Sequence, residues 1–188
     1  MNQRKIAQRR TLRRLRRGLD PGQRQRDDAA IAHQLWRALQ FHRGRQIAIY
    51  APVGSEVNLA GFVRRARAAG RQLWLPTIRH RALHFLPANA PLRPGRHRIL
   101  APCSGRARAP WALSVIVTPL LGFDLTGRRL GQGGGYYDRT LARLRPRRPW
   151  VLGVAYDCQE LPAVAADPWD QRLDGIITPT RIHFFCAP

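Results

Sequence analysis

LSVIVTPLLGFDLTGRRLGQGGGYYD, residues 113–138, carries the strongest structural signal in this sequence. Its opening run, residues 113–118, is almost entirely apolar and rich in β-branched side chains, which predicts a strand buried on both faces. A long loop with several glycines follows at residues 119–135, and residues 136–144 are expected to form a helix. A buried strand that leads through a glycine-rich loop into a helix is typical of open α/β sheets, whose ligands bind beyond the carboxyl ends of the strands.

Short apolar segments alternate with helical ones on both sides of this stretch. Further strands are predicted at residues 46–51, 72–76, 82–86, 150–155 and 175–178. Because these strands are apolar throughout, we expect a three-layer α/β fold, with a mostly parallel sheet and helices on both faces. A helix is expected at residues 58–69, irregular chain at 87–110, and the start of a helix or a loop at 158–168. No domain boundary is evident, so residues 1–188 are expected to form a single domain.

Residues 4–41 are expected to form two basic helices that pack on the α/β core. The first covers residues 4–17, and its apolar residues fall roughly on one stripe: Ile6, Leu12, Leu15 and Leu19. Asp20 is the expected N-cap of the second helix and Pro21 its first residue. This second helix is expected to end at about Phe41.

The composition excludes several classes of protein. Apolar residues make up 44% of the 188 residues, enough for one globular domain with a core. No apolar run reaches the roughly 20 residues of a membrane helix, and the basic N-terminus lacks the apolar stretch of a secretion signal. We therefore expect a cytoplasmic protein without membrane contact. The three cysteines are far apart and form no CxxC pair, so we expect reduced, mostly buried thiols rather than a disulfide framework or zinc site.

The formal net charge is +22, and Lys5 is the only lysine, so the charge is almost entirely arginine. Such an excess favours polyanionic partners, such as nucleic acid, ATP or a polycarboxylate. A nucleic-acid-binding protein is therefore one alternative, suggested mainly by the basic helix at residues 4–17. The sequence lacks an RNP motif, a zinc finger and a basic stripe interleaved with aromatic residues, which makes nucleic acid the less favoured partner. Dispersed, solvated arginines are the simplest interpretation of the remaining charge.

Residues 123–138, FDLTGRRLGQGGGYYD, have the composition of a phosphate-binding loop. The glycines at 131, 133, 134 and 135 remove side chains, which lets backbone N–H groups turn toward an anion. Arg128 and Arg129 are suited to pair with phosphate oxygens, and Asp138 is suited to hold a Mg²⁺ ion that bridges phosphates. The pattern is neither a Walker loop nor a dinucleotide-binding fingerprint. On these residues alone, a flexible surface turn stays open as an alternative.

The segment RLGQGGGYYDR resembles the signature of the 5-formyltetrahydrofolate cyclo-ligase family, and the preceding GFD resembles the family's Ala-Phe-Asp element. KIAQR at residues 5–9 resembles an N-terminal Lys-xxx-Arg element whose side chains contact ATP phosphates. YAPVGSEVN at 50–58 resembles the strand and turn that place a glutamate at the folate pocket, and Glu56 matches that position. DPWDQRLDGII at 167–177 resembles the segment with a second metal-binding aspartate, matched by Asp170. The resemblance thus covers most of the chain.

The resemblance implies an enzyme that uses ATP and Mg²⁺ to convert 5-formyltetrahydrofolate to 5,10-methenyltetrahydrofolate, releasing ADP and phosphate. It implies Mg²⁺ binding by Asp138 and Asp170. It implies ATP contacts at Lys5, Arg9, Arg129, Leu130, Gly131, Gln132, Gly133, Gly134, Gly135, Tyr136 and Tyr137. It implies folate contacts at Ala51, Glu56, Gln132, Gly133, Gly134, Gly135 and Tyr136. No catalytic nucleophile or acid–base residue is assigned, and no Ser-His-Asp or Cys-His set is evident.

Each of these assignments has a structural alternative. Lys5 and Arg9 are equally compatible with solvated charges on a helix. Glu56 also suits an acid that stabilises the start of the helix expected at 58–69. Asp170 and Asp174 also suit surface acids, although the resemblance favours Asp170 as the ligand. A regulatory or different ATP-dependent enzyme with the same ATP loop would give a similar sequence, and the pocket around Glu56 would distinguish it.

Two departures from the family pattern affect the expected site. Gly134 stands where some relatives carry a lysine, and Gln8 replaces a usual leucine. If lysine supplies phosphate charge in those relatives, the neighbouring arginines, among them Arg139, are the candidates to supply it here. The sequence leaves open the oligomeric state, for which we expect a monomer, and the number of glutamates on the folate.

Overall fold

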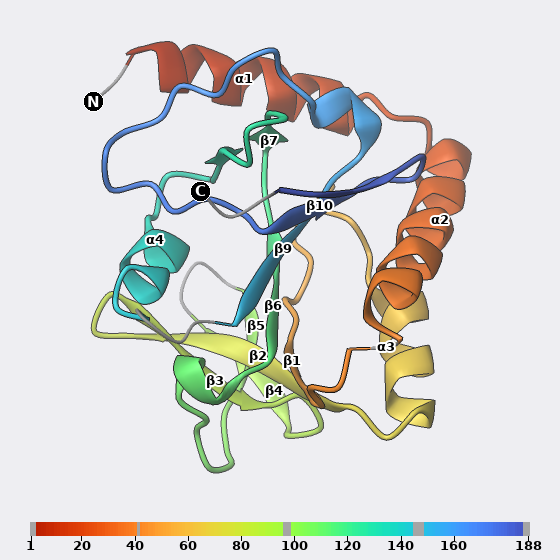
Figure 1. The fold of residues 1–188 in the computed structure, drawn as a ribbon, viewed down its shortest axis with the longest axis vertical. Helices are drawn as coiled ribbons and strands as arrows, with labels where there is room; N and C mark the ends of the chain where they lie inside the picture. The colour runs from red at the N-terminus through yellow and green to blue at the C-terminus, as the bar shows by residue number, and fades with distance from the viewer. Residues whose placement is uncertain (1–2, 41, 96–98, 145–148, 186–188) are drawn as a thin grey trace.

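A seven-stranded sheet forms the centre of the protein in the computed structural model, which describes residues 3–40, 42–95, 99–144 and 149–185 (Figure 1). Its strands are β1 (Gln46–Ala48), β2 (Gln72–Arg79), β3 (Ala82–Pro87), β6 (Val115–Pro119), β9 (Trp150–Val154), β10 (Gly175–Ile177) and β11 (Ile182–Phe184). Their order is β11-β10-β9-β6-β1-β2-β3. The neighbours from β10 to β2 pair in parallel, and the edge strands β11 and β3 are antiparallel. The predicted mostly parallel sheet is therefore confirmed.

Helices cover both faces of this sheet, as predicted. On one face, α2 (Pro21–Leu39) and α3 (Ala60–Ala68) lie side by side, and Leu35 and Phe62 pack into a core cluster with Val117 and Val154 (Figure 1). The other face is covered by α4 (Tyr136–Leu141) and irregular chain, which form a second core cluster around Phe123. Within the described part of the chain, no helix combines the length and apolar character that a membrane crossing requires.

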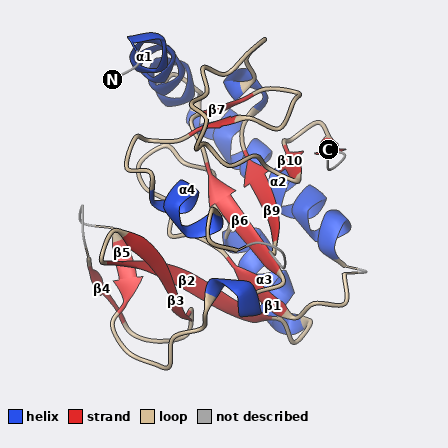
Figure 2. Ribbon diagram, turned by 60° about the vertical axis from the view of Figure 1, so that its left-hand side comes forward, coloured by secondary structure: helices blue, strands red, loops and turns tan. Residues whose placement is uncertain are grey.

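α1 (Gln3–Arg17) lies across the carboxyl ends of the strands rather than on a face of the sheet (Figures 1 and 2), and it buries a largely charged stripe. Its buried residues are Lys5, Leu12 and Arg16, whereas Ile6 and Leu15 are 43% and 45% exposed. The predicted apolar packing stripe is therefore wrong for Ile6 and Leu15. The reason is that loops at the strand ends present carbonyl and carboxylate oxygens, which accept hydrogen bonds from basic side chains and so bury polar groups without an unpaired partner.

Arginine side chains close the carboxyl ends of both N-terminal helices. The Arg24 guanidinium donates to carbonyl oxygens in and just after the last turn of α1: those of Arg16, Arg17 and Leu19. The Arg71 guanidinium donates to carbonyl oxygens at the end of α2: those of Leu39, Gln40, His42 and Gly44. The last carbonyls of a helix have no intrahelical donor, so these arginines satisfy groups that would otherwise need water. Part of the arginine excess is thus structural.

The start of α2 agrees with the sequence. Asp20 is its N-cap, with Oδ2 accepting a hydrogen bond of 2.9 Å from the backbone N of Gln23, and Pro21 is its first residue. The helix ends at Leu39, and the expected end at Phe41 lies outside the described residues.

Short elements account for most differences from the expected secondary structure. Residues 87–110 are not irregular throughout, because they contain an antiparallel ribbon: β4 (Leu92–Pro94) and β5 (Leu100–Pro102). Each of these strands has three residues and includes a proline, so neither leaves a recognisable pattern. The equally short β11 was likewise not predicted, and β1 ends at Ala48 rather than at residue 51. Residues 158–168 contain the end of a 3₁₀ turn, η3 (Asp157–Gln159), and an isolated bridge from Glu160 to Phe123, and are otherwise loop.

Two cysteines lie among the described residues, and both are free thiols. Cys103 is exposed just after the edge strand β5, and Cys158 is half-buried. The expectation of mostly buried thiols is therefore wrong for Cys103, while Cys186 lies outside the described residues.

The glycine-bearing stretch after β6 is not a single open loop. It contains an antiparallel pair of short strands: β7 (Gly122–Phe123) and β8 (Arg129–Leu130). Asp124, 2% exposed, closes the turn between them. Its Oδ1 accepts hydrogen bonds from the backbone N and hydroxyl of Thr126 and from the N of Arg128, and its Oδ2 accepts one of 2.8 Å from the N of Val164. This carboxylate therefore shapes the hairpin and ties it to a segment forty residues later.

Asp124→Ala is expected to lower the free energy of unfolding by about 3 kcal/mol, because it leaves buried N–H donors without an acceptor. Burial alone would raise the pKa of Asp124, but the hydrogen bonds from Thr126, Val164 and Arg128 outweigh it and hold the pKa below its usual value. The stabilisation is therefore complete above the unfolded-state pKa of about 4 and is lost as the pH falls through the folded-state pKa.

Urea unfolding of wild type and Asp124→Ala at about pH 7 and about pH 3 measures both effects, and the gap between the two proteins should narrow at the lower pH. Asp27→Ala, which changes the same residue type at a half-buried position of α2 with a single side-chain partner among the described residues, Gln23, is the control and should change stability by less than about 0.5 kcal/mol. Equal stability of Asp124→Ala and wild type at neutral pH would contradict the role given to this carboxylate.

Candidate active site

Three segments that are distant in sequence meet beyond the carboxyl ends of β6 and β9: α1, the glycine loop (residues 131–135) and the C-terminal segment (residues 163–171). Arg9 Nε donates a hydrogen bond of 2.9 Å to the carbonyl oxygen of Gly131. Gln8 bonds the C-terminal segment through both ends of its amide, donating to the carbonyl of Ala163 at 2.8 Å and accepting from the N of Ala165 at 3.0 Å. α1 therefore joins the other two segments, and Gln8 has a structural role that leucine could not fill.

Lys5 pairs with two carboxylates of the C-terminal segment. Its Nζ lies 2.7 Å from Asp167 Oδ2 and 2.5 Å from Asp170 Oδ2. Asp170 Oδ2 also accepts a hydrogen bond of 2.8 Å from the backbone N of Asp167, which fixes the turn. Burial alone would lower the pKa of Lys5, but the hydrogen bonds and charges of Asp167 and Asp170 outweigh it and raise the pKa above its usual value. Lys5 is thus a charged, largely buried link between the two ends of the chain rather than a solvated charge.

Arg129 and Asp138 form a second ion pair at the base of the glycine loop. Arg129 is 6% exposed, and its Nη2 lies 2.6 Å from Asp138 Oδ1. The same oxygen accepts a hydrogen bond of 3.1 Å from the backbone N of Gln171. Arg129 Nε, in contrast, is buried and has no hydrogen-bond partner in the described part of the chain. Arg24 Nε and Arg108 Nε are also buried without a partner among the described residues, but of the three arginines only Arg129 lines the cavity beside the glycine loop, where its donor could meet an anion.

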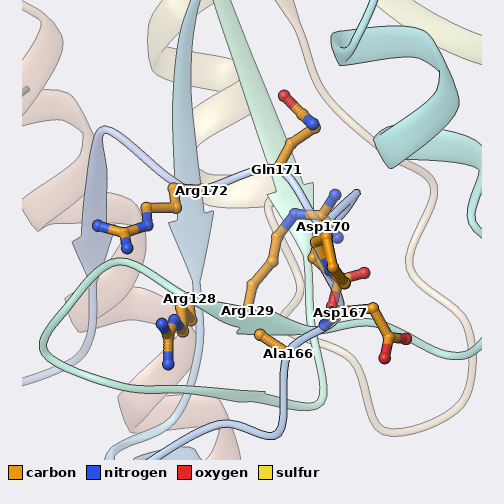
Figure 3. Close-up of a pocket in the computed structure, with 8 residues that line it drawn as sticks. Arg128, Arg129, Ala166, Asp167, Asp170, Gln171 and Arg172 are labelled. Carbon is orange, nitrogen blue, oxygen red and sulfur yellow. Dashed lines mark hydrogen bonds between the residues drawn. The ribbon is translucent and has the colours of Figure 1, made fainter. Parts of the chain in front are cut away.

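A cavity of about 310 Å³ opens between the β8 end and the C-terminal segment (Figure 3). It is lined by Arg128, Arg129, Ala166, Asp167, Pro168, Asp170, Gln171 and Arg172. Figure 3 shows Arg128 and Arg172 on the opposite side of the pocket from Asp167 and Asp170. The cavity therefore has arginine side chains on one side and, on the other, carboxylates beside the Arg129 guanidinium, and this mixture of charges suits an anion accompanied by a metal ion (Figure 3).

The predicted metal ligands are Asp138 and Asp170. The backbone N of Gln171, the residue after Asp170, donates a hydrogen bond to Asp138, and this contact brings the two aspartates near each other. Hydrogen bonds in the described part of the chain use Oδ1 of Asp138 and Oδ2 of Asp170, which leaves the second oxygen of each carboxylate without a donor. No cluster of three or more His, Cys, Asp or Glu side chains suited to a metal occurs among the described residues. Two carboxylates suit Mg²⁺, which usually keeps several water molecules and phosphate oxygens as its other ligands.

Backbone angles and steric contacts explain why glycine occupies these positions of the loop. Gly133 and Gly135 adopt φ angles of +110° and +65°, which disfavour residues with a side chain. At Gly134, a Cβ would lie 2.6 Å from the ring of Tyr136, so the lysine that the family pattern allows at this position would require that ring to move. The carbonyl of Gly134 accepts a hydrogen bond of 2.7 Å from Arg139, which places a guanidinium beside the position of that lysine.

The hydrophobic members of the predicted ATP set anchor the loop in the core. Leu130 is 1% exposed and packs with Leu12 of α1 and Val164 of the C-terminal segment. Tyr136 and Tyr137 both pack against the second core cluster, and burial raises the pKa of Tyr137 well above its usual value. α4 spans only residues 136–141, so the predicted extension to residue 144 is wrong.

Glu56 lies in a narrow crevice under the C-terminal half of α1, lined by Arg16, Tyr50, Glu56, Val57, Pro119, Leu120, Val154 and Gln159. Its Oε2 accepts a hydrogen bond of 3.0 Å from the backbone N of Val53, and its Oε1 accepts one of 3.3 Å from Gln132 Nε2. Ala51, the other predicted folate residue outside the loop, packs against the first core cluster. Because α3 has no acid in its first turn, Glu56 does not act as a helix-start acid. It contacts the glycine loop instead.

A sequence profile of the 5-formyltetrahydrofolate cyclo-ligase family matches residues 1–179. The chain belongs to this family. The 5-formyltetrahydrofolate cyclo-ligase of Escherichia coli (strain K12) is 28% identical over 179 residues, which cover 91% of this chain and 98% of that protein.

Two solved structures of 5,10-methenyltetrahydrofolate synthetases have the same fold. That from Aquifex aeolicus superposes with a TM-score of 0.86 at 27% identity, covering 98% of this chain and 94% of its own. That from Mycoplasma pneumoniae superposes with a TM-score of 0.78 at 27% identity, covering 93% of this chain and 98% of its own. The family resemblance and the fold class read from the sequence are thus confirmed.

Three residues at the site of this family member were not singled out in the sequence. Arg16 is buried and donates to Ser55 Oγ at 3.0 Å and to the carbonyl of Leu120 at 3.2 Å. Arg13 donates to Gln132, and Asp167 shares Lys5 with Asp170. Arg13 and Arg16 follow Arg9 at helical spacings of four and seven, which would have placed all three on one face. Asp174, in contrast, accepts a hydrogen bond of 2.8 Å from the N of Val151 at the start of β9.

Lys5→Ala is expected to lower the free energy of unfolding by about 2 kcal/mol, because it leaves two partly buried carboxylates without their cation. Arg10→Ala, which removes one exposed positive charge from the same helix, should change stability by less than about 0.5 kcal/mol. Urea unfolding at neutral pH compares the two variants with wild type. If Lys5→Ala is as stable as Arg10→Ala, the ion pairs do not hold α1 in place.

Proposed function

We propose that this protein closes the ring of 5-formyltetrahydrofolate with ATP and Mg²⁺, forming 5,10-methenyltetrahydrofolate, ADP and phosphate. Membership of the cyclo-ligase family supports the reaction. The observation that supports assigning the reaction to this site is the hydrogen bond between Glu56 and Gln132, because it joins the predicted folate and ATP regions. Residues 1–188 act as one domain in this proposal, because α1 and the C-terminal segment both contribute to the site.

In this proposal the triphosphate of ATP binds at the glycine loop and the adjoining cavity. The buried Arg129, whose Nε has no partner in the described chain, supports an anion at this position. Lys5 and Arg9 from α1 add positive charge. The proposed ATP contacts are Lys5, Arg9, Arg129, Leu130, Gly131, Gln132, Gly133, Gly134, Gly135, Tyr136 and Tyr137.

Asp138 and Asp170 are the proposed Mg²⁺ ligands, and the unused oxygen on each carboxylate supports this assignment. When bound, Mg²⁺ would neutralise the negative charge of the phosphates. Arg129 and Lys5 keep these two carboxylates oriented, and Arg129 also lines the cavity proposed for the triphosphate. The pairing thus prevents repulsion between clustered carboxylates before the substrates bind.

The chemistry requires a better leaving group on the formyl carbon. Transfer of the γ-phosphoryl group to the formyl oxygen forms an iminium-type phosphate at N5 and releases ADP. N10 then attacks the formyl carbon and gives up its proton to solvent or to the departing phosphate, and the carbon–oxygen bond breaks to release phosphate and leave the ring closed. Such a reaction depends on positioning and charge neutralisation rather than on a protein nucleophile. This agrees with a site built from glycines, arginines and carboxylates.

The proposed folate site centres on Glu56, which hydrogen-bonds the pterin or orients the folate. Its carboxylate accepts hydrogen bonds only, so it suits the N–H donors of a pterin ring. The other proposed folate contacts are Ala51, Gln132, Gly133, Gly134, Gly135 and Tyr136. The sharing of glycine-loop residues between the two substrates is supported by the contact of Gln132 with Glu56.

Purified protein given 5-formyltetrahydrofolate, ATP and Mg²⁺ is expected to form the near-ultraviolet-absorbing methenyl product, with no product when ATP is omitted. Absorbance over time measures the reaction, and calorimetry with ATP alone measures nucleotide binding. Absence of product together with clear ATP binding would leave the nucleotide site and make the folate assignment wrong.

Asp138→Asn is expected to lower turnover in Mg²⁺ by about 100-fold, because the amide keeps the shape of the side chain but loses the charge that holds the metal. The matched control is Asp157→Asn, at the 3₁₀ turn η3 and outside the site. Initial rates over a series of Mg²⁺ concentrations compare both variants with wild type. Unaltered turnover in Asp138→Asn would remove its role as a metal ligand.

A further inference from the structure

A chain of hydrogen bonds runs from α1 through the glycine loop to Glu56. Arg13 donates to the side-chain oxygen of Gln132 from Nη2 at 3.1 Å and from Nε at 3.3 Å, and its Nη2 also donates to the backbone carbonyl of Gln132 at 3.4 Å. Gln132 Nε2 then donates to Glu56 Oε1 at 3.3 Å, and Glu56 Oε2 accepts from the N of Val53. The amide of Gln132 thus connects Arg13, which is 119 residues away in sequence, with Glu56, which is 76 residues away.

The chemistry of the three side chains gives this chain one direction. A guanidinium only donates hydrogen bonds, and a carboxylate only accepts them. The amide of Gln132 between them must therefore turn its oxygen to Arg13 and its nitrogen to Glu56. The Glu56 carboxylate by itself favours the donor end of this amide. Arg13 adds a second constraint, because it holds the amide oxygen and the backbone carbonyl of Gln132 and so fixes the side chain at both ends.

We propose that Arg13 is a positioning residue that holds the glycine loop in register with Glu56. The inference rests on the proposed function, in which the loop carries the triphosphate and Glu56 the folate. The reacting phosphorus and formyl oxygen must then be positioned with a precision of a few tenths of an ångström. A misplacement of about 1 Å costs on the order of 100-fold in rate. Arg13 fixes both the backbone and the side chain of Gln132, whereas Arg9 holds only the carbonyl of Gly131.

The neighbouring Arg14 provides a matched control. It lies on the exposed side of α1, it is the same residue type, and its loss changes the net charge by the same amount. Arg13→Ala is expected to lower kcat by about tenfold, the size expected for a lost hydrogen bond with a charged donor, whereas Arg14→Ala should stay within about twofold of wild type. Equal effects of the two substitutions would overturn the proposal.

A double-mutant cycle separates positioning through Gln132 from a general structural effect. In a Gln132→Ala background, Arg13→Ala should lower kcat by less than about twofold more, because the amide on which Arg13 acts is gone. Additive losses would mean that Arg13 acts by another route and would overturn the proposal.

Backbone order parameters of residues 131–135, from ¹⁵N relaxation of the ligand-free protein, test the same contact without any reaction. They should fall toward about 0.6 in Arg13→Ala and stay at wild-type values in Arg14→Ala. If wild type forms no methenyl product, the proposed function fails, and this measurement alone decides whether Arg13 holds the loop. Unchanged order parameters in Arg13→Ala would overturn that role.

Discussion

Lys5 pairs with Asp167 and Asp170 and so joins the first helix of the chain to its C-terminal segment. The rest of the site depends on this contact, because α1 lies over the strand ends only while its basic side chains have acceptors there. Once α1 is in place, Arg9 and Arg13 reach the glycine loop and Arg16 reaches the crevice beside Glu56. A helix that buries two charged residues beside Leu12 is stable only because each buried cation finds oxygen partners.

The arginine excess is partly explained by this architecture. Arg24 and Arg71 each donate to several carbonyl oxygens at helix ends, and Arg65 and Arg108 lie over the rings of Trp36 and Trp74 at 4.9 and 4.7 Å. A guanidinium with five donors can satisfy several carbonyls at once and can also stack on aromatic rings, which an ammonium group does less well. These arginines therefore stabilise the fold by capping helix ends and packing on aromatic rings, and this role requires no polyanionic partner.

The site also depends on a rigid start to the glycine loop. Asp124 closes the β7–β8 hairpin, and Leu130 packs between Leu12 and Val164, so the chain enters the loop from a fixed position. Gly133 and Gly135 then allow backbone angles that other residues disfavour. The loop is therefore glycine-rich but held at both ends, by the hairpin before it and by Tyr136 and Tyr137 after it. Such a loop combines close approach to a ligand with little conformational freedom, which favours positioning.

Local pattern was sufficient for a central buried strand, observed as β6 at Val115–Pro119, and for the parallel sheet, because burial on both faces is visible in neighbouring residues. The family followed from the resemblance of RLGQGGGYYDR to its signature. Reasoning from local pattern was wrong for Ile6 and Leu15 of α1 but not for Leu12, since a helical period assumes an apolar surface beneath the whole stripe. The sequence did not predict Asp167 and Arg13 as site residues, because their partners lie 162 and 119 residues away. Only the folded chain brings those oxygens under the helix, and this long-range pairing makes a charged stripe the buried one.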